Sequence, residues 1–457
     1  MAEHSVTVEN TLKTLLEEKK YSTLKDILIT VNPADIAAIF EELNEESVPL
    51  LFRLLPKEQA AESFVEMEPE LQEMLIKGFS DKELHEVMAE LYVDDAADLV
   101  EEMPANVVKR ILDQSDPVMR KEINEILRYP ENSAGSIMTT EYVSLRPDMS
   151  VGEAIVRIRK TGVDKETIYT CYVTEGRKLL GFVTLKDLLM SHDDDMKIST
   201  LMDENVISVS TNDDREEIAQ LLSKYNFIAL PVVDSDKRMV GIITFDDAMD
   251  VLEEEATEDI EKMAGMLPSE KTYLHSNSFD LFRQRIPWLL LLMISATFTG
   301  MIISRFENAL AAQVVLTAFI PMLMDTGGNS GSQSSVTVIR AISLGELEFA
   351  DIGSVIWKEI KAAVLCGVVL SCACFAKIML IDRLLMGNND VTILVAAVVC
   401  ATMAMTVLVA KIIGCVLPMC AKKMGLDPAV MASPFITTIV DALSLLVYFG
   451  IASALLF

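Results

Sequence analysis

A single carboxylate, Asp441, interrupts the apolar run ASPFITTIVDALSLLVYFGIASALLF near the carboxyl end of the chain. A carboxylate at the centre of a membrane helix costs about 2.5–3.5 kcal/mol on insertion scales, so intramembrane acids generally serve a function. Pro434, Thr437, Thr438 and Ser444 fall on or near the helical face of Asp441, which gives an apolar rod one polar stripe. The stripe favours a helix that faces water or an ion. The alternative is a buried aspartate that only serves packing.

A second set of acids lies in DVLEEEATEDIEKMAGM, which starts at Asp250. Read as a helix, the segment stacks like charges one turn apart, from Asp250 through Glu254 to Glu258 and from Glu255 to Asp259. Such stacking is destabilising unless something neutralises it. A bound divalent cation would do so, although a charged helix face is also a common way to meet solvent.

Other ligand chemistries have little support. The four histidines, His4, His85, His192 and His275, form no cluster, and the seven cysteines have no metal or redox spacing. Any metal ligands are therefore oxygens, which points to Mg²⁺ or Ca²⁺.

Charge divides the chain in two. The whole chain has 457 residues, 51% of them hydrophobic, and a formal net charge of −30. From Ser276 onward there are 11 acidic residues and 11 lysines and arginines, so the excess charge lies entirely in the first 275 residues. This pattern predicts an acidic soluble half and a membrane half. Repulsion by phosphates argues against a nucleic-acid partner. The first 20 residues have no apolar core, so we expect the soluble half to stay in the cytoplasm.

Residues 1–130 are predicted to be a helical solenoid. PADIAAIFEEL, KEQAAESFVEM and VDDAADLVEEM each combine an Ala-Ala pair with apolar residues and acids at helical spacing. Repeats of this kind stack as helical hairpins.

Residues 135–252 contain a different repeat, in which short β-runs alternate with helices. GFVTLKD and GIITFDD close the two copies, and their glycines, Gly181 and Gly241, are 60 residues apart. Each copy reads strand, helix, strand, turn, strand, helix. This order resembles a tandem pair of CBS domains, with the first domain at 135–199 and the second at 200–252.

The CBS resemblance implies a nucleotide cleft, with ATP as a possible ligand. The residues that match its phosphate- and ribose-binding positions are Thr184 with Asp187 and Thr244 with Asp247. The competing interpretation is that each pair caps the helix that follows it.

The second half contains five predicted membrane spans at roughly 286–304, 309–341, 354–381, 391–419 and 428–457, because about 20 apolar residues cross the hydrocarbon core. Lys411 lies within the fourth span, and we expect it to snorkel toward the cytoplasmic end. With the amino terminus inside, most basic residues fall on the cytoplasmic side, as the positive-inside rule requires; these are Arg283, Arg285, Arg340, Lys358, Lys361, Lys422 and Lys423.

The second span carries DTGGNSGSQSS after Pro321. A backbone so rich in Gly and Ser cannot face lipid and must be buried or line a watery path. Asp325, Asn329 and Gln333 together favour proximity to a pore over packing alone.

The full arrangement resembles the MgtE family of magnesium channels. The anchors are DVLEEEATEDI, RIPWLLLLM, TGGNSGSQSS and GLDPAVMASPFITTIVDALSLLVYF, and they follow the family order across essentially the whole chain. The resemblance implies a multidomain fold: an α-helical solenoid N domain (1–130), α/β tandem CBS domains, an acidic connecting helix (253–275) and an all-α transmembrane domain of five helices (276–457).

The resemblance also implies function. We expect a homodimeric, Mg²⁺-selective channel of the plasma or inner membrane, not an enzyme, which closes when cytoplasmic Mg²⁺ is high. Asp441 matches the pore acid, with Ser433, Thr437 and Asn329 lining the pore, and Asp427 matches a carboxylate at the cytoplasmic mouth. The other matching Mg²⁺ ligands are Glu62, Asp94, Asp98, Asp214, Glu216, Asp247, Asp250, Glu255, Glu258 and Asp259.

In the implied mechanism, the sensor acids repel one another without Mg²⁺ and are bridged when it binds. Asn226 stands where an acid is expected in some relatives. Two other functions remain open from the residues alone: a cation-coupled carrier with its site in the broken second span, and a CBS-regulated membrane sensor that transports nothing.

Overall fold

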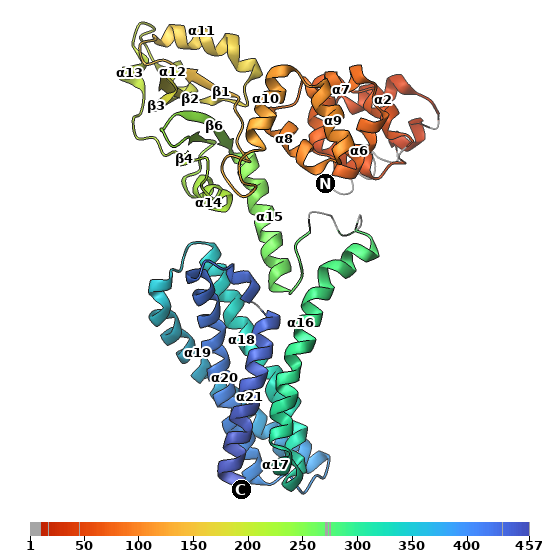
Figure 1. Cartoon of the computed structure of the whole chain (residues 1–457), viewed down its shortest axis with the longest axis vertical. Helices are drawn as coiled ribbons and strands as arrows, with labels where there is room; N and C mark the ends of the chain where they lie inside the picture. Colours follow the sequence, from red (N-terminus) through yellow and green to blue (C-terminus); the bar gives the residue numbers. More distant parts are fainter. Residues whose placement is uncertain are drawn as a thin grey trace. The chain divides into compact units, whose positions relative to one another are not determined.

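The computed structural model describes residues 11–16, 18–44, 46–269, 273, 276–431 and 433–456. Its contacts divide the chain into two units, Met1–Leu252 and Glu253–Phe457. Figure 1 shows the elements of each unit.

The first part of the amino-terminal unit is helical, as predicted. Each Ala-Ala segment forms one helix, and alanines such as Ala61 and Ala97 are buried, which lets neighbouring helices approach closely. Short polar caps and prolines separate the helices: Asn32 and Asp116 accept hydrogen bonds at helix starts, each just before a proline. The helices are α2 (Tyr21–Leu28), α3 (Pro33–Glu41), α4 (Val48–Phe52), α5 (Lys57–Val65), α6 (Pro69–Gly78), α7 (Asp81–Met88), α8 (Val93–Glu102), α9 (Ala105–Gln114) and α10 (Pro117–Ile126).

Two three-stranded sheets follow, one in each predicted CBS copy. In both, the first strand is parallel to the second and the second antiparallel to the third. The first copy consists of β1 (Tyr142–Leu145), α11 (Val151–Thr161), η1 (Gly162–Asp164), β2 (Thr167–Glu175), β3 (Lys178–Thr184) and α12 (Leu185–Met190). The second consists of α13 (Ile198–Leu201), β4 (Val209–Ser210), α14 (Arg215–Tyr225), β5 (Ala229–Val233), β6 (Met239–Thr244) and the start of α15 (Phe245–Met263).

The two copies exchange backbone hydrogen bonds. Thr139, before the first sheet, pairs with Ile242 of β6, and Asp203, before the second sheet, pairs with Phe182 of β3. A Cβ at Gly241 would lie 2.6 Å from the Thr139 carbonyl oxygen, and one at Gly181 would lie 2.6 Å from that of Asp203. The repeated glycine is therefore what allows each copy to accept a segment of the other.

Helix α15 differs from the predicted connecting helix. It begins at Phe245, as the last helix of the second copy, and ends at Met263. Gly265 adopts a positive φ of 71°, and the Met266 N–H donates to the Glu261 carbonyl, which closes the helix with a Schellman motif.

The carboxyl-terminal unit is all-helical. Within the described residues, four segments are long and apolar enough to cross a membrane: Ser278–Arg305, Phe349–Leu385, Ile393–Lys423 and Pro428–Leu456. The elements are α16 (Ser278–Arg305), α17 (Glu307–Ala312), η2 (Val314–Phe319), α18 (Ile320–Ser343), η3 (Phe349–Asp351), α19 (Ile352–Lys377), the π-helical η4 (Ile378–Leu385), α20 (Ile393–Lys423), η5 (Pro428–Met431) and α21 (Ser433–Leu456).

The structure divides the predicted second span into three elements, α17, η2 and α18. Helix α18 is the longest of them. Pro321 occupies the first turn of α18, where its missing N–H and fixed φ are compatible with a helix start. Gly327, Gly328 and Gly331 of α18 are buried. Helix α18 packs against α20 and α21, so the prediction that this Gly- and Ser-rich backbone avoids lipid is supported by its position.

Candidate cation-binding sites

The polar stripe of α21 centres on Asp441, whose side chain is half-buried in the single chain. Within the described residues, the Asp441 carboxylate forms no hydrogen bond or ion pair. The Thr437 and Thr438 hydroxyls donate back to the Pro434 carbonyl at 2.9 and 3.0 Å. The side chain of Ser433 lies outside the described residues. The stripe therefore offers Asp441 as an uncommitted carboxylate next to hydroxyl oxygens that can still accept.

Helix α18 forms the wall behind this stripe. A Cβ at Gly328 would lie 3.1 Å from the Thr437 methyl carbon and 3.8 Å from Asp441 Oδ1, so only a glycine permits this approach comfortably. Asn329 is exposed, and its amide donates to Asp325 Oδ1 at 3.2 Å. Asp325 also repels the Asp441 carboxylate. The predicted pore residue Asn329 thus lies on the helix that flanks Asp441, and it is hydrogen-bonded to a second acid, Asp325.

A lysine lies between two of the predicted metal ligands at the other acidic region of this unit. Lys262 Nζ lies 2.5 Å from Glu258 Oε1 and 2.7 Å from Asp427 Oδ2, with 23% of its side chain exposed. Burial lowers the pKa of Lys262, but the two carboxylates outweigh it and raise that pKa above its usual value. The ammonium therefore stands where a cation bridging Glu258 and Asp427 would stand.

Two further contacts fix this region. Asp427 Oδ1 accepts from the Ala429 N–H at 2.8 Å, and Ser343 Oγ donates to Asp259 Oδ2 at 3.1 Å. Burial is the main cause that raises the pKa of Asp259. Asp259, a predicted ligand, is thus bound to α18 rather than left free.

In the amino-terminal unit, acids from α8 meet acids from the CBS pair. Asp94 is 7% exposed, and Asp94 Oδ1 and Glu166 Oε2 are buried without a hydrogen-bond partner in the described part of the chain. No lysine or arginine of the described chain pairs with Asp94, Asp95, Glu166 or Asp247. We call these four residues the acidic cluster.

The electrostatics of the acidic cluster are those of like charges held together. Burial, followed by repulsion from Asp247, raises the pKa of Asp95 to about 7 and that of Glu166 to about 8. Burial also raises the pKa of Asp247 to about 6 and holds that of Asp94 well above its usual range. A divalent cation would remove the repulsion that keeps these protons bound.

Sequence analysis found Asp94 and Asp247 but missed Asp95 and Glu166. Glu166 immediately precedes β2, and only the fold brings it near α8; no local pattern marks it. Asp95 lies beside Asp94 in VDDAADLVEEM, and the doubled acid was the available signal.

The other predicted ligands have varied surroundings. Asp98 lies on α8 with an exposed surface, yet the protein around its carboxylate, followed by repulsion from Asp95 and Asp247, raises its pKa to about 8. Glu62 is exposed on α5, where it forms no hydrogen bond or ion pair with another predicted ligand in the described chain. Asp214 caps α14, accepting from the N–H groups of Glu216 and Glu217, while Glu216 accepts from Gln220. Asp250 and Glu255 lie on α15.

Asn226 ends α14 with a left-handed φ of 54°. This conformation suits Asn better than most residues, which gives a backbone reason for its neutrality. Among the described residues, no group of three or more His, Cys, Asp or Glu has the arrangement of a complete metal site within one chain.

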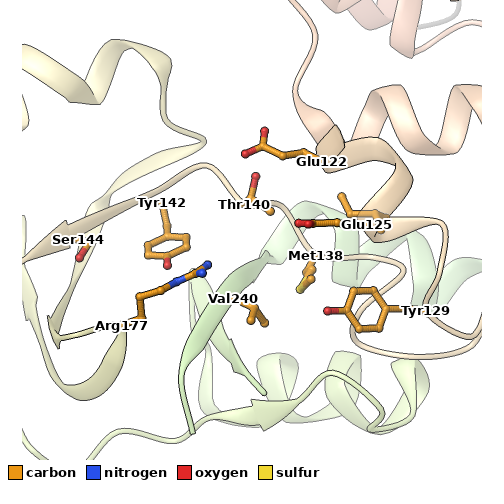
Figure 2. Close-up of a pocket in the computed structure, with 10 residues that line it drawn as sticks. Glu122, Glu125, Tyr129, Met138, Thr140, Tyr142, Ser144, Arg177 and Val240 are labelled. Atoms are coloured by element: carbon orange, nitrogen blue, oxygen red, sulfur yellow. The ribbon is translucent and has the colours of Figure 1, made fainter. Parts of the chain in front are cut away.

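The first predicted nucleotide pair forms a helix cap, and the second pair is joined by side-chain hydrogen bonds. The Thr184 side chain accepts from the Asp187 N–H while Asp187 accepts from Thr184, and the Thr244 hydroxyl donates to Asp247. A pocket of about 320 Å³ lies elsewhere, between α10 and the CBS pair, where Arg177 faces Glu125 and Tyr129 (Figure 2). None of the four predicted residues lines this pocket.

Lys411 does not snorkel, so that prediction is wrong. Its side chain is 9% exposed and its ammonium lies 3.7 Å from Glu359 of α19 and 3.1 Å from Ser334 Oγ of α18. The contacts with Glu359 and Ser334 hold the ammonium among the helices instead of at the membrane surface.

Comparisons with known proteins define the class. The model "Divalent cation transporter" matches residues 320–451, "MgtE intracellular N domain" matches 31–132, and "CBS domain" matches 134–192 and 198–254. The chain is therefore a divalent cation transporter with a cytosolic helical domain and a CBS pair.

Relatives specify the class further. The chain is 35% identical to the magnesium transporter MgtE of Thermus thermophilus, over 97% of this chain and 98% of the relative, and 32% identical to that of Bacillus subtilis, over 96% and 95%. It belongs to the MgtE family, and it is a membrane protein that transports Mg²⁺.

Solved structures match the soluble part. The cytosolic domain of the Mg²⁺ channel MgtE in complex with ATP is 37% identical, with a TM-score of 0.51, and the match covers 53% of this chain and 99% of that one. The soluble part of a magnesium transporter is 29% identical, with a TM-score of 0.52, over 55% and 99%.

Proposed function

We propose that two copies of this chain form a Mg²⁺-selective channel that closes when cytoplasmic Mg²⁺ is high. The observation that carries the proposal is Asp441, a half-exposed carboxylate on an otherwise apolar helix, with no hydrogen-bond or ion-pair partner in the described part of the chain. Exposing a carboxylate of this kind to lipid is energetically costly. A second α21 across a two-fold axis would enclose the stripe and supply a second carboxylate.

The ion that this pore takes is hydrated. Mg²⁺ gives up its water reluctantly, so paired Asp441 carboxylates hold it through its first shell of water. Outer-shell contact is weak enough for the ion to leave, which conduction requires. Thr437 and the backbone near Ser433 provide further oxygens along the same face.

The acidic cluster serves as the sensor. Asp94 and Glu166 each have a buried oxygen without a hydrogen-bond partner among the described residues, so Mg²⁺ bound there would gain ligands and relieve repulsion at once. Asp98, Glu62, Asp214, Glu216, Asp250 and Glu255 complete bridging sites in the closed dimer. At Glu258 and Asp427, Mg²⁺ competes with the ammonium of Lys262.

ATP binds at the CBS pair under the same proposal, through Thr184 with Asp187 or Thr244 with Asp247. The support is the relative whose cytosolic domain was crystallised with ATP. Radiolabelled ATP binding to the full-length protein, in wild type and in Asp187→Ala, tests it. Equal binding would exclude the first cleft.

Mg²⁺ flux in reconstituted vesicles tests the channel. Asp441→Ala should abolish flux while the exposed Asp390→Asn control retains it, and high Mg²⁺ on the cytosolic side should close the wild type. Unaltered flux in Asp441→Ala would refute the pore assignment. Single-channel recording separates a channel from a carrier, since a carrier gives no unitary currents.

A further inference from the structure

Three helices of the membrane unit meet at one buried polar junction. Ser334 of α18 donates its hydroxyl hydrogen to Glu359 Oε2 of α19 at 2.7 Å and accepts from Lys411 Nζ of α20 at 3.1 Å. The Lys411 and Glu359 side chains are 9% and 16% exposed. The three residues form one continuous chain of charge-assisted hydrogen bonds.

Stability alone is a poor reason for this junction. Bringing two charges out of water costs about as much as their attraction returns, and well-packed apolar replacements of a buried ion pair are often neutral or stabilising. Within a membrane, ionisable residues are rare and generally functional. The junction therefore calls for a role beyond holding the helices together.

The position of the junction indicates that role. One turn from Ser334, the Gly331 carbonyl oxygen lies only 2.3 Å from where a Cβ of Gly414 would be, so α18 and α20 touch backbone to backbone there. A Cβ at Gly331 would lie 2.9 Å from Ile436 of α21 and 3.3 Å from the Ala410 carbonyl oxygen of α20. The glycines of α18 thus allow it to approach both α20 and α21 closely.

The glycines of α18 contribute no side chains of their own to these contacts, so directional hydrogen bonds add to what fixes the axial register of the helix. The two directional hydrogen bonds at Ser334, which donates to Glu359 and accepts from Lys411, help to fix it. The register of α18 in turn decides which backbone lies behind the pore stripe, since Gly328 packs against Thr437 and beside Asp441.

We propose that Lys411 and Glu359, bridged by Ser334, are positioning residues that set the register of α18 and through it the ion selectivity at Asp441. The proposal rests on the pore role of Asp441. Neither residue touches the ion.

The test compares single and double replacements in the full-length protein. Lys411→Met and Glu359→Gln each leave one buried charge unpaired and should lower the melting temperature. The double variant Lys411→Met/Glu359→Leu removes both charges and should regain most of that loss. Its ratio of Mg²⁺ flux to Ca²⁺ flux in vesicles should still differ from wild type by about twofold or more, the smallest coupling expected within a shared network.

Two further variants keep the test decisive. Ser334→Ala keeps both charges, removes only the bridge, and should shift the flux ratio in the same direction. Lys411→Arg retains a cation and should stay closer to the wild-type ratio than Lys411→Met.

Wild-type flux ratios in both Ser334→Ala and the double variant would overturn the proposal, and so would a double variant that fails to assemble while Ser334→Ala keeps the wild-type ratio. Failure of the pore assignment is seen separately, as undiminished flux in Asp441→Ala.

Discussion

The two units differ in the charged groups that surround their clustered acids. In the amino-terminal unit, Asp94, Asp95, Glu166 and Asp247 face one another, and no basic residue of the described chain pairs with them. In the carboxyl-terminal unit, Glu359 has Lys411, while Glu258 and Asp427 share Lys262. The acidic cluster therefore has no counter-ion among the described residues, whereas these sites of the second unit each contain a lysine.

This difference separates carboxylates that could respond to Mg²⁺ from carboxylates that hold the structure together. Mg²⁺ binding relieves the repulsion among carboxylates that lack a counter-ion and so stabilises the state in which they lie close together. A carboxylate already bound to a lysine responds only if the ion displaces an ammonium. Asp441 resembles the first class, although it lies in the second unit.

The largest effect should follow from removing charge from the acidic cluster. In wild type, Mg²⁺ at a hundred times its dissociation constant should stabilise the soluble unit by about 2.7 kcal/mol. Asp94→Asn/Asp247→Asn should lose nearly all of this stabilisation because the ligands are gone. Melting temperatures of the full-length protein with and without Mg²⁺ measure it. An Mg²⁺ response equal to that of the exposed Asp113→Asn control would contradict the comparison.

Acid should weaken the same response. Folding raises the pKa of Glu166 to about 8 and of Asp95 to about 7, so between about pH 4 and pH 8 the folded state binds more protons than the unfolded state. Stability without Mg²⁺ therefore falls as pH rises through this window. Mg²⁺ must displace both protons, so its apparent affinity should fall by about two orders of magnitude or more from pH 8 to pH 6. Calorimetric titration at both values checks this, and equal affinities would argue against the cluster as the site.

Replacing the lysine should make one site of the second unit behave like the first. Lys262→Met leaves Glu258 and Asp427 without their cation. The partly exposed pair contributes about 1 kcal/mol, so flux at zero internal Mg²⁺ should rise about fivefold while high Mg²⁺ still closes the channel. Lys262→Arg is the matched control and should behave like wild type. Identical curves for Met and wild type would show that the ammonium does not compete with Mg²⁺.

The smallest change in Mg²⁺ response should come from the cap that lies outside the acidic cluster. Thr184→Ala removes one exposed capping bond and should cost about 1 kcal/mol or less in stability, with no change in Mg²⁺ response. Thr244→Ala disturbs Asp247 directly and should change that response. Equal effects of the two variants would remove the distinction between the two copies.

Local patterns allowed most of the fold to be predicted. The Ala-Ala segments, the repeated GxxTxxD and the polar stripe on α21 each depend on residues close in sequence, where periodicity indicates structure directly. The end of α15 also has a local signal, Gly265, because a glycine with positive φ commonly follows a helix. The division of the second span followed from Pro321, whose preference for a helix start outweighed the continuous apolar pattern.

The site was less accessible, because it depends on contacts between distant segments. Glu166 reaches α8 only through the CBS sheet, and Lys262 meets Asp427 only through tertiary packing. Lys411 shows the same limit: hydropathy places it in a helix but cannot tell whether its partner lies inward or at the surface.

The exchanged pairing at Gly181 and Gly241 has a consequence for biosynthesis. Each copy borrows a backbone edge from the other, so the first copy cannot complete its hydrogen bonds until the ribosome has delivered the second. A truncation between them would leave the backbone groups of Thr139 and Phe182 without these partners.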